Sequence, residues 1–273
     1  IYILPTKNST VFFKTQKDER VEALEKRENF VNVLGVDSDF IGWVKEESFE
    51  KIRGLIVFIQ FSISVAIVVF FMYLFRNHTH KVIKIWMKIQ MFFLGIKLEI
   101  EGNLDESCDL ILINHQSMLD IIVMEHLHSR NIAWVAKKEI ADLFFFGHII
   151  KAPKMISVDR ENKAGLIHLL KEAKDRLDKK RPIAMFPEGT RSDGTKMLSF
   201  RPGAKMIANK YNLKVQPIIL FNTRNIVDSK SLKASPGIVK VVFLDPIQAD
   251  KTTDWFEQTE ENMKETFNKE YKN

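Results

Sequence analysis

The chain has 273 residues, 45% hydrophobic and 28% charged, which is enough for one sizeable core and a small accessory unit. Its formal net charge of +6 hides two parts of opposite sign, because residues 1–50 carry 7 Lys and Arg against 10 Asp and Glu, and the rest carries 34 against 25. A single cysteine, Cys108, excludes an internal disulfide and a cysteine-based metal site, and the sequence holds no metal-ligand cluster, dinucleotide-binding fingerprint, P-loop or internal repeat.

Residues 1–50 contain short runs typical of β-strands. The segment closes with Asp37-Ser-Asp-Phe-Ile-Gly-Trp-Val-Lys45, and this ending resembles the last strands of bacterial Src-homology-three-like domains. The resemblance implies a small all-β, barrel-like domain over residues 1–50. In such a barrel Trp43 is either a core residue, which is the commoner role, or a platform for a ligand. Because the chain begins with Ile1 rather than Met, we expect the numbering to start inside a longer polypeptide.

Residues 51–97 have the composition of a membrane anchor. Leu55–Phe75 is an uncharged stretch of 21 residues, which as a helix would be roughly 30 Å long, the thickness of the hydrocarbon core of a bilayer. Basic residues flank it on both sides: Lys51, Arg53 and Arg76. The stretch therefore predicts a membrane span, and a buried helix of a soluble protein is the less favoured alternative.

The next apolar segment, Val82–Ile96, is interrupted by Lys84 and Lys88, which share one helical face with Lys81. These charges and the short length predict an interfacial helix rather than a second span. Positive charge is heavier after Leu55–Phe75 than before it, so the positive-inside rule places the C-terminal part in the cytoplasm. The N-terminal domain would then face the periplasm if the stretch spans the bilayer, which we favour, and the cytoplasm if it dips into one leaflet.

Residues 98–273 alternate between strand and helix patterns. Strands are predicted at 109–114, 132–136, 154–158, 182–186, 214–220 and 237–244. Helices are predicted at 118–126, 163–179, 202–211 and 254–271. Such alternation is typical of a layered α/β domain.

The first motif with chemical content is Asn114-His-Gln-Ser-Met-Leu-Asp120, directly after an apolar run. Histidine takes a proton readily near neutral pH, and a carboxylate on its other ring nitrogen fixes the tautomer. Positions i and i+5 of a helix lie about 140° apart, so His115 and Asp120 meet only if His115 lies in the loop or first turn. Asn114 is expected to cap the helix. Ser117 lacks a nucleophile elbow, so we expect the base to activate a hydroxyl of the substrate; a capped helix with a surface histidine is the alternative.

A second motif, Phe186-Pro-Glu-Gly-Thr-Arg-Ser192, also follows an apolar run. Gly189 permits a tight turn, Thr190 adds a hydroxyl donor, and Arg191 offers a planar fork that binds phosphate. Glu188 cannot favour an anion directly, so it is expected to orient a basic residue or to bind a substrate hydroxyl. An ordinary surface turn is the alternative. Sites in open α/β sheets form at the carboxyl ends of strands, which favours one shared site for both motifs.

From about residue 76 to residue 273 the chain resembles the glycerolipid acyltransferase family, specifically the bacterial 1-acyl-sn-glycerol-3-phosphate acyltransferases. Four blocks follow the family's order: N-H-Q-S-M-L-D, K-M-I-S-V-D-R, F-P-E-G-T-R-S and V-Q-P-I-I-L. The segments A-K-K-E-I and F-R-P-G-A-K match as well, and the departure at Ser157-Val158 is small. The resemblance implies a layered α/β acyltransferase domain in residues 98–273, preceded by a membrane anchor in residues 51–97.

The resemblance also implies roles for individual residues. His115 and Asp120 would be the catalytic pair. The substrate-binding residues would be Lys137, Arg160, Glu188, Gly189, Thr190, Arg191 and Pro217, the last on the acyl-binding side and the others near the glycerol phosphate. No metal and no bound cofactor are implied. The aromatic run Leu143–Phe146 either lines an acyl channel or belongs to the core.

The predicted reaction moves a fatty acyl group from a thioester of acyl carrier protein or coenzyme A to the sn-2 hydroxyl of lysophosphatidic acid, giving phosphatidic acid. The basic part of the chain suits anionic membrane lipids and an acidic carrier, and no nucleic-acid partner is expected. The expected location is the bacterial inner membrane, with the catalytic domain in the cytoplasm. The alternatives are another acceptor, such as glycerol 3-phosphate or a different lysophospholipid, and a membrane-anchored protein that binds cell-wall peptide.

Overall fold

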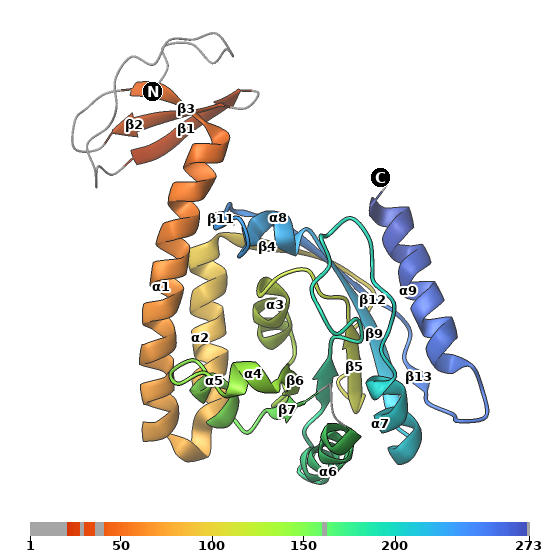
Figure 1. Ribbon diagram of the computed structural model, residues 1–273. Coiled ribbons are helices and arrows are strands. Elements are labelled where there is room, and N and C mark those ends of the chain that lie inside the picture. The colour runs from red at the N-terminus through yellow and green to blue at the C-terminus, as the bar shows by residue number, and fades with distance from the viewer. Residues whose placement is uncertain (1–20, 28–29, 36–40, 160–162, 272–273) are drawn as a thin grey trace.

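The computed structural model describes residues 21–27, 30–35, 41–159 and 163–271, which form a small N-terminal sheet, a helical hairpin and an α/β domain (Figure 1). The α/β domain is built on one mixed sheet in the order β4-β12-β9-β5-β8-β6-β7, with β13 paired to β9. These strands are β4 (Ile96–Glu101), β5 (Leu110–Ile113), β6 (Ala133–Lys137), β7 (Ile156–Val158), β8 (Ile183–Met185), β9 (Lys214–Phe221), β12 (Gly237–Phe243) and β13 (Ile247–Gln248). A separate short ribbon is formed by β10 (Val227–Asp228) and β11 (Lys233–Ala234).

Helices cover both faces of this sheet, because alternate strand residues point to opposite faces and both sets are apolar. Ile111 and Ile113 of β5 pack with the first three helices, whereas Leu110 and Leu112 pack with α6, α7 and α9. The helices are α1 (Glu46–Leu74), α2 (Thr79–Leu94), α3 (Leu119–Leu127), α4 (Lys138–Ala141), α5 (His148–Lys151), α6 (Lys163–Asp178), α7 (Gly203–Tyr211), α8 (Thr223–Ile226) and α9 (Trp255–Tyr271), with a 3-10 turn, η1 (Arg76–His78), between α1 and α2.

The layered α/β architecture predicted from the sequence is confirmed. The six predicted strands and four predicted helices of this region all end within two residues of the expected bounds. The sequence pattern does not predict β4. This strand lies at the edge of the sheet beside β12, and none of its residues is buried. A strand without a buried apolar run carries little signal in the sequence.

The described part of residues 1–50 contains three strands: β1 (Val21–Arg27), β2 (Phe30–Gly35) and β3 (Ile41–Lys45). They form an antiparallel sheet in the order β1-β2-β3, with β1 and β3 as its two edges. β-Structure in this segment is therefore present, but these strands do not close into a barrel, and the barrel-like domain stays a prediction. α1 follows β3 directly and carries this sheet at its N-terminal end (Figure 1).

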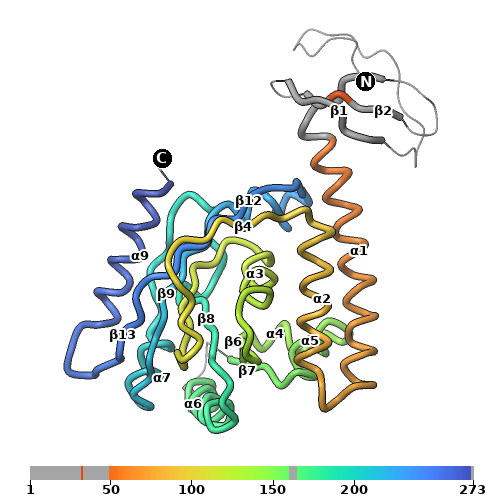
Figure 2. The backbone as a smooth tube through the Cα atoms, turned by 180° about the vertical axis from the view of Figure 1, so that it is seen from behind, coloured from red at the N-terminus to blue at the C-terminus, as the bar shows by residue number. Residues whose placement is uncertain are grey.

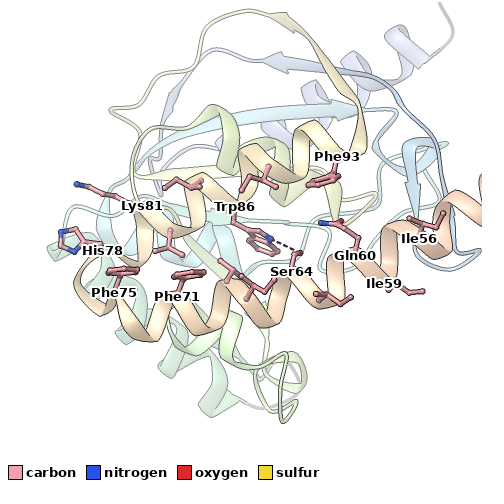
Figure 3. Close-up of a pocket in the computed structure, with 16 residues that line it drawn as sticks. Ile56, Ile59, Gln60, Ser64, Phe71, Phe75, His78, Lys81, Trp86 and Phe93 are labelled. Atoms are coloured by element: carbon pink, nitrogen blue, oxygen red, sulfur yellow. Dashed lines mark hydrogen bonds between the residues drawn. The ribbon is translucent and has the colours of Figure 1, made fainter. Parts of the chain in front are cut away.

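The anchor region is an antiparallel pair of helices rather than a lone span followed by a surface helix. Phe49–Leu74 of α1 is long and apolar enough to cross a membrane, and it packs against α2 along its length (Figure 3). Ser64 joins the two helices, because its hydroxyl oxygen accepts hydrogen bonds from Trp86 Nε1 and Gln90 Nε2, both at 3.1 Å. An apolar groove of about 920 Å³ runs between α1 and α2 on the outer face of the pair.

The cationic helix face predicted for Lys81, Lys84 and Lys88 is divided in the structure. Lys84 points inward to α3, where its ammonium group donates to the Glu125 carboxylate at 2.8 Å and to two backbone carbonyls. Lys81 and Lys88 are exposed. The helix therefore uses Lys84 to dock on the α/β domain, which the charge pattern alone does not indicate.

α1 lies along the α/β domain from one end to the other. Near its start, the Arg53 guanidinium donates to the Leu94 carbonyl at 3.0 Å, and Gly54 packs directly on the turn before β11. Near its end, the Tyr73 hydroxyl meets His148 Nδ1 of α5 at 2.6 Å. The hairpin is thus a structural layer of the domain, as both views show (Figures 1 and 2).

Replacement of Gly54 by Ala tests this docking. A Cβ atom at this position would lie 2.0 Å from the Leu232 carbonyl oxygen, a backbone atom that cannot rotate away. We expect the free energy of unfolding to fall by about 1–3 kcal/mol, the usual cost of overpacking, measured as a lower Tm in detergent. Gly203→Ala is the matched control, because its Cβ would meet only side chains at 3.7 and 3.9 Å; an equal loss in both variants would contradict the close packing at Gly54.

Candidate active site

The two sequence motifs meet at the carboxyl ends of adjacent parallel strands. β5 and β8 pair in parallel, with Leu112 beside Met185, so the residues that follow each strand lie side by side. His115 lies in the loop after β5, and Asp120 is the second residue of α3. His115 Nδ1 and Asp120 Oδ2 are 2.8 Å apart. The sequence prediction that these residues meet only with the histidine outside the helix is confirmed.

The Asp120 carboxylate is fully buried and is held by four donors. Oδ2 accepts hydrogen bonds from His115 Nδ1 and from the backbone N–H groups of Gln116 and Ser117, at 2.8, 2.8 and 2.9 Å. Oδ1 accepts the Thr223 hydroxyl at 2.5 Å. The hydrogen bond between Nδ1 and a carboxylate oxygen that already accepts two backbone N–H groups favours the Nδ1–H tautomer of the imidazole. Nε2 is then the ring atom that accepts a proton.

Asn114 has a different role from the helix cap that the sequence indicates. Its side chain pairs with Leu220 of β9 like a further strand residue, donating to the Leu220 carbonyl at 2.9 Å and accepting the Leu220 N–H at 2.7 Å. The N-cap position of α3 is Met118, which makes no capping hydrogen bond, and the Leu119 N–H donates instead to the Ser117 hydroxyl at 3.3 Å. The cap prediction is wrong because a neighbouring strand, distant in sequence, offers both a donor and an acceptor to the amide.

Aromatic stacking supports the imidazole from one side. The rings of His115 and Phe186 are parallel to within 12°, with centroids 3.8 Å apart, and Trp134 stacks on the other side of the cluster at 5.4 Å from Phe186. Trp134 Nε1 donates to the Glu125 carboxylate at 2.8 Å, the same group that binds Lys84 of the hairpin. Packing on one ring face and the bond to Asp120 together restrict the imidazole to one orientation.

Glu188 of the second motif points inward. It is 2% exposed, and its two oxygens accept the backbone N–H groups of His115 at 2.7 Å and Leu198 at 2.6 Å. Burial raises the pKa of this carboxyl to about 7, while the two N–H donors act in the opposite direction. The backbone of Ser192 adds a second link by donating to the His115 carbonyl at 2.8 Å. These hydrogen bonds connect the loop of the second motif to His115.

Gly189, Thr190 and Arg191 form a turn that places the Thr190 and Arg191 side chains at the surface. Gly189 has φ +75°, which suits a residue without a side chain, and its N–H donates to the Phe186 carbonyl at 3.0 Å. Thr190 is exposed. Arg191 is exposed as well, and its guanidinium donates to the Ser229 hydroxyl at 3.0 Å.

A pocket of about 640 Å³ opens beside this turn, at the carboxyl ends of β6, β7 and β8, with a mainly apolar lining that also includes the acidic Asp159. Lys137, Glu188, Gly189 and Thr190 line it, together with Arg201. Arg201 is missed by the sequence reasoning, although it lies in the F-R-P-G-A-K segment that matches the family. Its backbone N–H donates to the Pro187 carbonyl at 2.7 Å, which fixes this segment beside the turn.

Two of the predicted substrate-binding residues that the structure describes are not among those that line this pocket. Arg191 reaches Ser229 instead, and Pro217 is buried inside β9, beside Leu112 of β5. Arg160 lies outside the described residues. The structure therefore gathers the predicted residues Lys137, Glu188, Gly189 and Thr190, and adds Arg201.

Comparisons with known proteins show the family of the chain. A family model described as "Acyltransferase" matches residues 95–220. A protein named 1-acyl-sn-glycerol-3-phosphate acyltransferase from Helicobacter pylori (strain J99) is 44% identical over 179 residues, which are 65% of this chain and 76% of that protein. The chain belongs to this acyltransferase family. The resemblance drawn from the four motif blocks is thereby confirmed.

Other members of the family are more distant. A protein of the same name from Cocos nucifera is 32% identical over 173 residues, or 63% of this chain, and the chain spans 55% of its length. The crystal structure of the 1-acyl-sn-glycerophosphate acyltransferase PlsC from Thermotoga maritima matches with a TM-score of 0.66 at 21% identity, covering 83% of this chain and 96% of that one. At this identity the structural likeness shows a shared fold.

Thr223 is a positioning residue that the acyltransferase motifs do not contain, and its replacement tests the network around Asp120. Thr223→Val removes one donor to a buried carboxylate, worth about 1.5–3 kcal/mol, so we expect kcat for acyl transfer to fall about tenfold or more with KM unchanged, because Thr223 does not line the pocket. Thr223→Ser keeps the hydroxyl and should restore the rate. Equal kcat in the Val and Ser variants would show that the hydroxyl is not needed.

The raised pKa of Glu188 predicts a pH dependence of stability. Between its ordinary value of 4.5 and about 7 the folded protein holds a proton that the unfolded chain has lost. The stabilising contribution of this group is therefore fully present below about pH 4.5 and is lost as the pH rises to about 7. Relative to Glu188→Gln, the free energy of unfolding of the unmodified protein should fall from pH 5 to pH 7 and then level off.

Glu257→Gln serves as the control for this measurement, because the Lys205 ammonium lowers the pKa of Glu257 and keeps it ionised over the same range. Its difference from the unmodified protein should not vary between pH 5 and pH 8. A constant difference for Glu188→Gln as well would contradict the raised pKa.

Proposed function

We propose that the chain transfers a fatty acyl group from a thioester to the sn-2 hydroxyl of lysophosphatidic acid, giving phosphatidic acid. The observation that carries this proposal is the position of the His115–Asp120 pair at the carboxyl end of β5, where Glu188 joins the His115 loop to a turn beside a pocket that Lys137 and Arg201 line. The relatives from Helicobacter pylori and Cocos nucifera are named as acyltransferases of 1-acyl-sn-glycerol 3-phosphate, which supports lysophosphatidic acid as the acceptor.

The proposed chemistry needs one base and no covalent intermediate on the protein. His115 Nε2 takes the proton of the acceptor hydroxyl while its oxygen attacks the thioester carbonyl, and Asp120 stabilises the imidazolium that forms. When the tetrahedral intermediate collapses, the C–S bond breaks and the imidazolium returns the proton to the leaving thiolate. Ser117 does not compete as a nucleophile, since its hydroxyl is buried and donates to the Val227 carbonyl at 2.6 Å.

The acceptor phosphate is proposed to bind in the pocket beside the second motif. Lys137 and Arg201 supply positive charge, and the Thr190 hydroxyl supplies a further donor. Glu188 is proposed to act on the architecture of this site rather than on the phosphate, because both of its oxygens are occupied by backbone N–H groups. Arg160 keeps its predicted role in binding the glycerol phosphate, and so does Arg191, which would have to leave Ser229 to reach the pocket.

The chain associates with a membrane through its apolar hairpin, and we propose that this hairpin lies in one leaflet. The stretch from Arg53 to Tyr73 would be roughly 30 Å long, about the thickness of the hydrocarbon core. Both of its ends contact the α/β domain, at Leu232 beside Gly54 and at His148 beside Tyr73, so a span would draw the polar surface of that domain into the bilayer. We therefore favour the leaflet-bound alternative over the span expected from the sequence, with both terminal domains on the cytoplasmic side.

Acyl transfer by the purified, detergent-solubilised chain tests the proposed reaction. Lysophosphatidic acid should be converted with a thioester of acyl carrier protein, of coenzyme A, or of both, and no metal or bound cofactor should be required. His115→Ala should lower kcat at least about 10³-fold, because removal of a triad-type base has effects of that order, while fold and membrane association stay unchanged.

Two outcomes would change this conclusion. Activity retained by His115→Ala would overturn the assignment of the base. Turnover of glycerol 3-phosphate or another lysophospholipid by the unmodified chain, without turnover of lysophosphatidic acid, would overturn the acceptor. His126→Ala is a matched control, since this histidine lies at the end of α3 and the proposed reaction should be insensitive to it.

A further inference from the structure

The aromatic run Leu143–Phe146 is exposed, so the alternative that placed it in the core is wrong. The four side chains of this run are 50%, 97%, 39% and 40% exposed, in chain order, and Ile140 just before them is 45% exposed. The run also does not line the 640 Å³ pocket beside the second motif. Exposed apolar side chains in such a contiguous group mark an interaction surface.

This surface has a fixed shape. Gly147 closes the run tightly, because a Cβ atom there would lie 2.2 Å from the Ala141 carbonyl oxygen and 2.5 Å from that of Leu143. The Leu143, Gly147 and His148 N–H groups bond within the segment, to the carbonyls of Ile140, Leu143 and Phe145. The run is thus a tight turn whose backbone N–H groups bond to carbonyls of the same segment. The rings point outward in the folded state.

The run is continuous with the apolar face of the hairpin. α5, which follows it, contacts α1 through the hydrogen bond between Tyr73 and His148, whose rings also meet edge to face at 5.5 Å. On α1, the neighbouring Phe70 and Leu74 are 63% and 60% exposed. The hairpin and the run therefore form one apolar surface on the same side of the α/β domain, away from α9 (Figures 1 and 2).

Charge at the margin of this surface fits a bilayer with anionic lipids. Lys138, Lys151 and Lys154 are exposed on the same segment, against the acidic Glu139 and Asp142. Aromatic rings beside exposed lysines are the composition of membrane–water interfaces, where the rings enter the boundary of headgroups and acyl chains and the ammonium groups meet phosphates.

We propose that Leu143–Phe146 inserts into the leaflet that holds the hairpin, as a second membrane contact whose occupant is lipid. α4, which precedes the run, begins directly after Lys137, one of the cationic residues of the pocket. An inserted run would hold the mouth of this pocket at the membrane surface, where a lysophospholipid acceptor has its headgroup. This consequence for the acceptor rests on the proposed acyl transfer, whereas the insertion itself rests only on the proposed placement of the hairpin in one leaflet.

Depth-dependent quenching tests the insertion. Phe144→Cys allows attachment of an environment-sensitive fluorophore, and the native Cys108 should not compete, because it is fully buried and burial raises its pKa to about 11. In vesicles of phosphatidylcholine and phosphatidylglycerol, lipids with a spin label on the acyl chain should quench the probe at position 144 and shift its emission to the blue. The matched control is Tyr271→Cys at the end of α9, a site 54% exposed and on the opposite side of the molecule.

Equal quenching at positions 144 and 271 would overturn the proposal. So would a blue shift at position 144 that appears in detergent and grows with protein concentration without quenching by lipid, since a second copy of the chain would then cover the surface.

A second measurement tests whether Leu143–Phe146 helps the lysophosphatidic acid acceptor to reach the site. Phe144→Ser should raise the KM for long-chain lysophosphatidic acid in vesicles about tenfold, the order expected for loss of one buried phenylalanine ring. Its kcat, and its activity on a short-chain acceptor below the micellar concentration, should not change, and Tyr271→Ser should match the unmodified chain. An unchanged KM would overturn the role in acceptor access. Failure of the unmodified chain to acylate lysophosphatidic acid would overturn the proposed function and leave the quenching result standing.

Discussion

The buried carboxylate of Asp120 is the constraint on which the site depends. A charge removed from water is costly unless donors replace its hydration, and here four of them do. Two are backbone N–H groups of the loop that carries the histidine, so the conformation of this loop and the position of the carboxylate determine each other. The third is the histidine itself, and the fourth is Thr223 from α8. The loop after β5, the start of α3 and the start of α8 are thereby fixed around one group.

Glu188 is a second carboxylate buried close to His115. Its donors are two neutral backbone N–H groups, and burial raises its pKa to about 7. The two acids hold different parts of the site: Asp120 lies against Nδ1 of the imidazole, and Glu188 connects the loops of the two motifs. The expectation that Glu188 orients a basic residue or binds a substrate hydroxyl did not include these backbone donors, which the sequence alone does not reveal.

Much of the fold could be predicted because its signals are local. Buried strands and amphipathic helices carry their own periodicity, and a histidine and an aspartate five residues apart meet in only one arrangement. Features that depend on residues distant in sequence could not be predicted. Asn114 pairs with Leu220, and Thr223 reaches Asp120 across 103 positions. The exposure of the side chains around Phe144 could not be predicted for another reason. An apolar run in a sequence fits a core or the lining of a channel as well as an exposed surface, and only its neighbours in space distinguish these.

The helical hairpin and His115 belong to one packed unit. Lys84 of the hairpin binds Glu125, Glu125 binds the indole of Trp134, and Trp134 stacks in the cluster in which Phe186 covers His115. Every link in this series is a direct contact between described side chains. Removal of the hairpin would leave the Glu125 carboxylate, which is 2% exposed, without its cationic partner beneath the aromatic cluster. The hairpin therefore completes the interior of the α/β domain, and the apolar groove between α1 and α2 is the outer face of the layer that packs on the aromatic cluster beside His115.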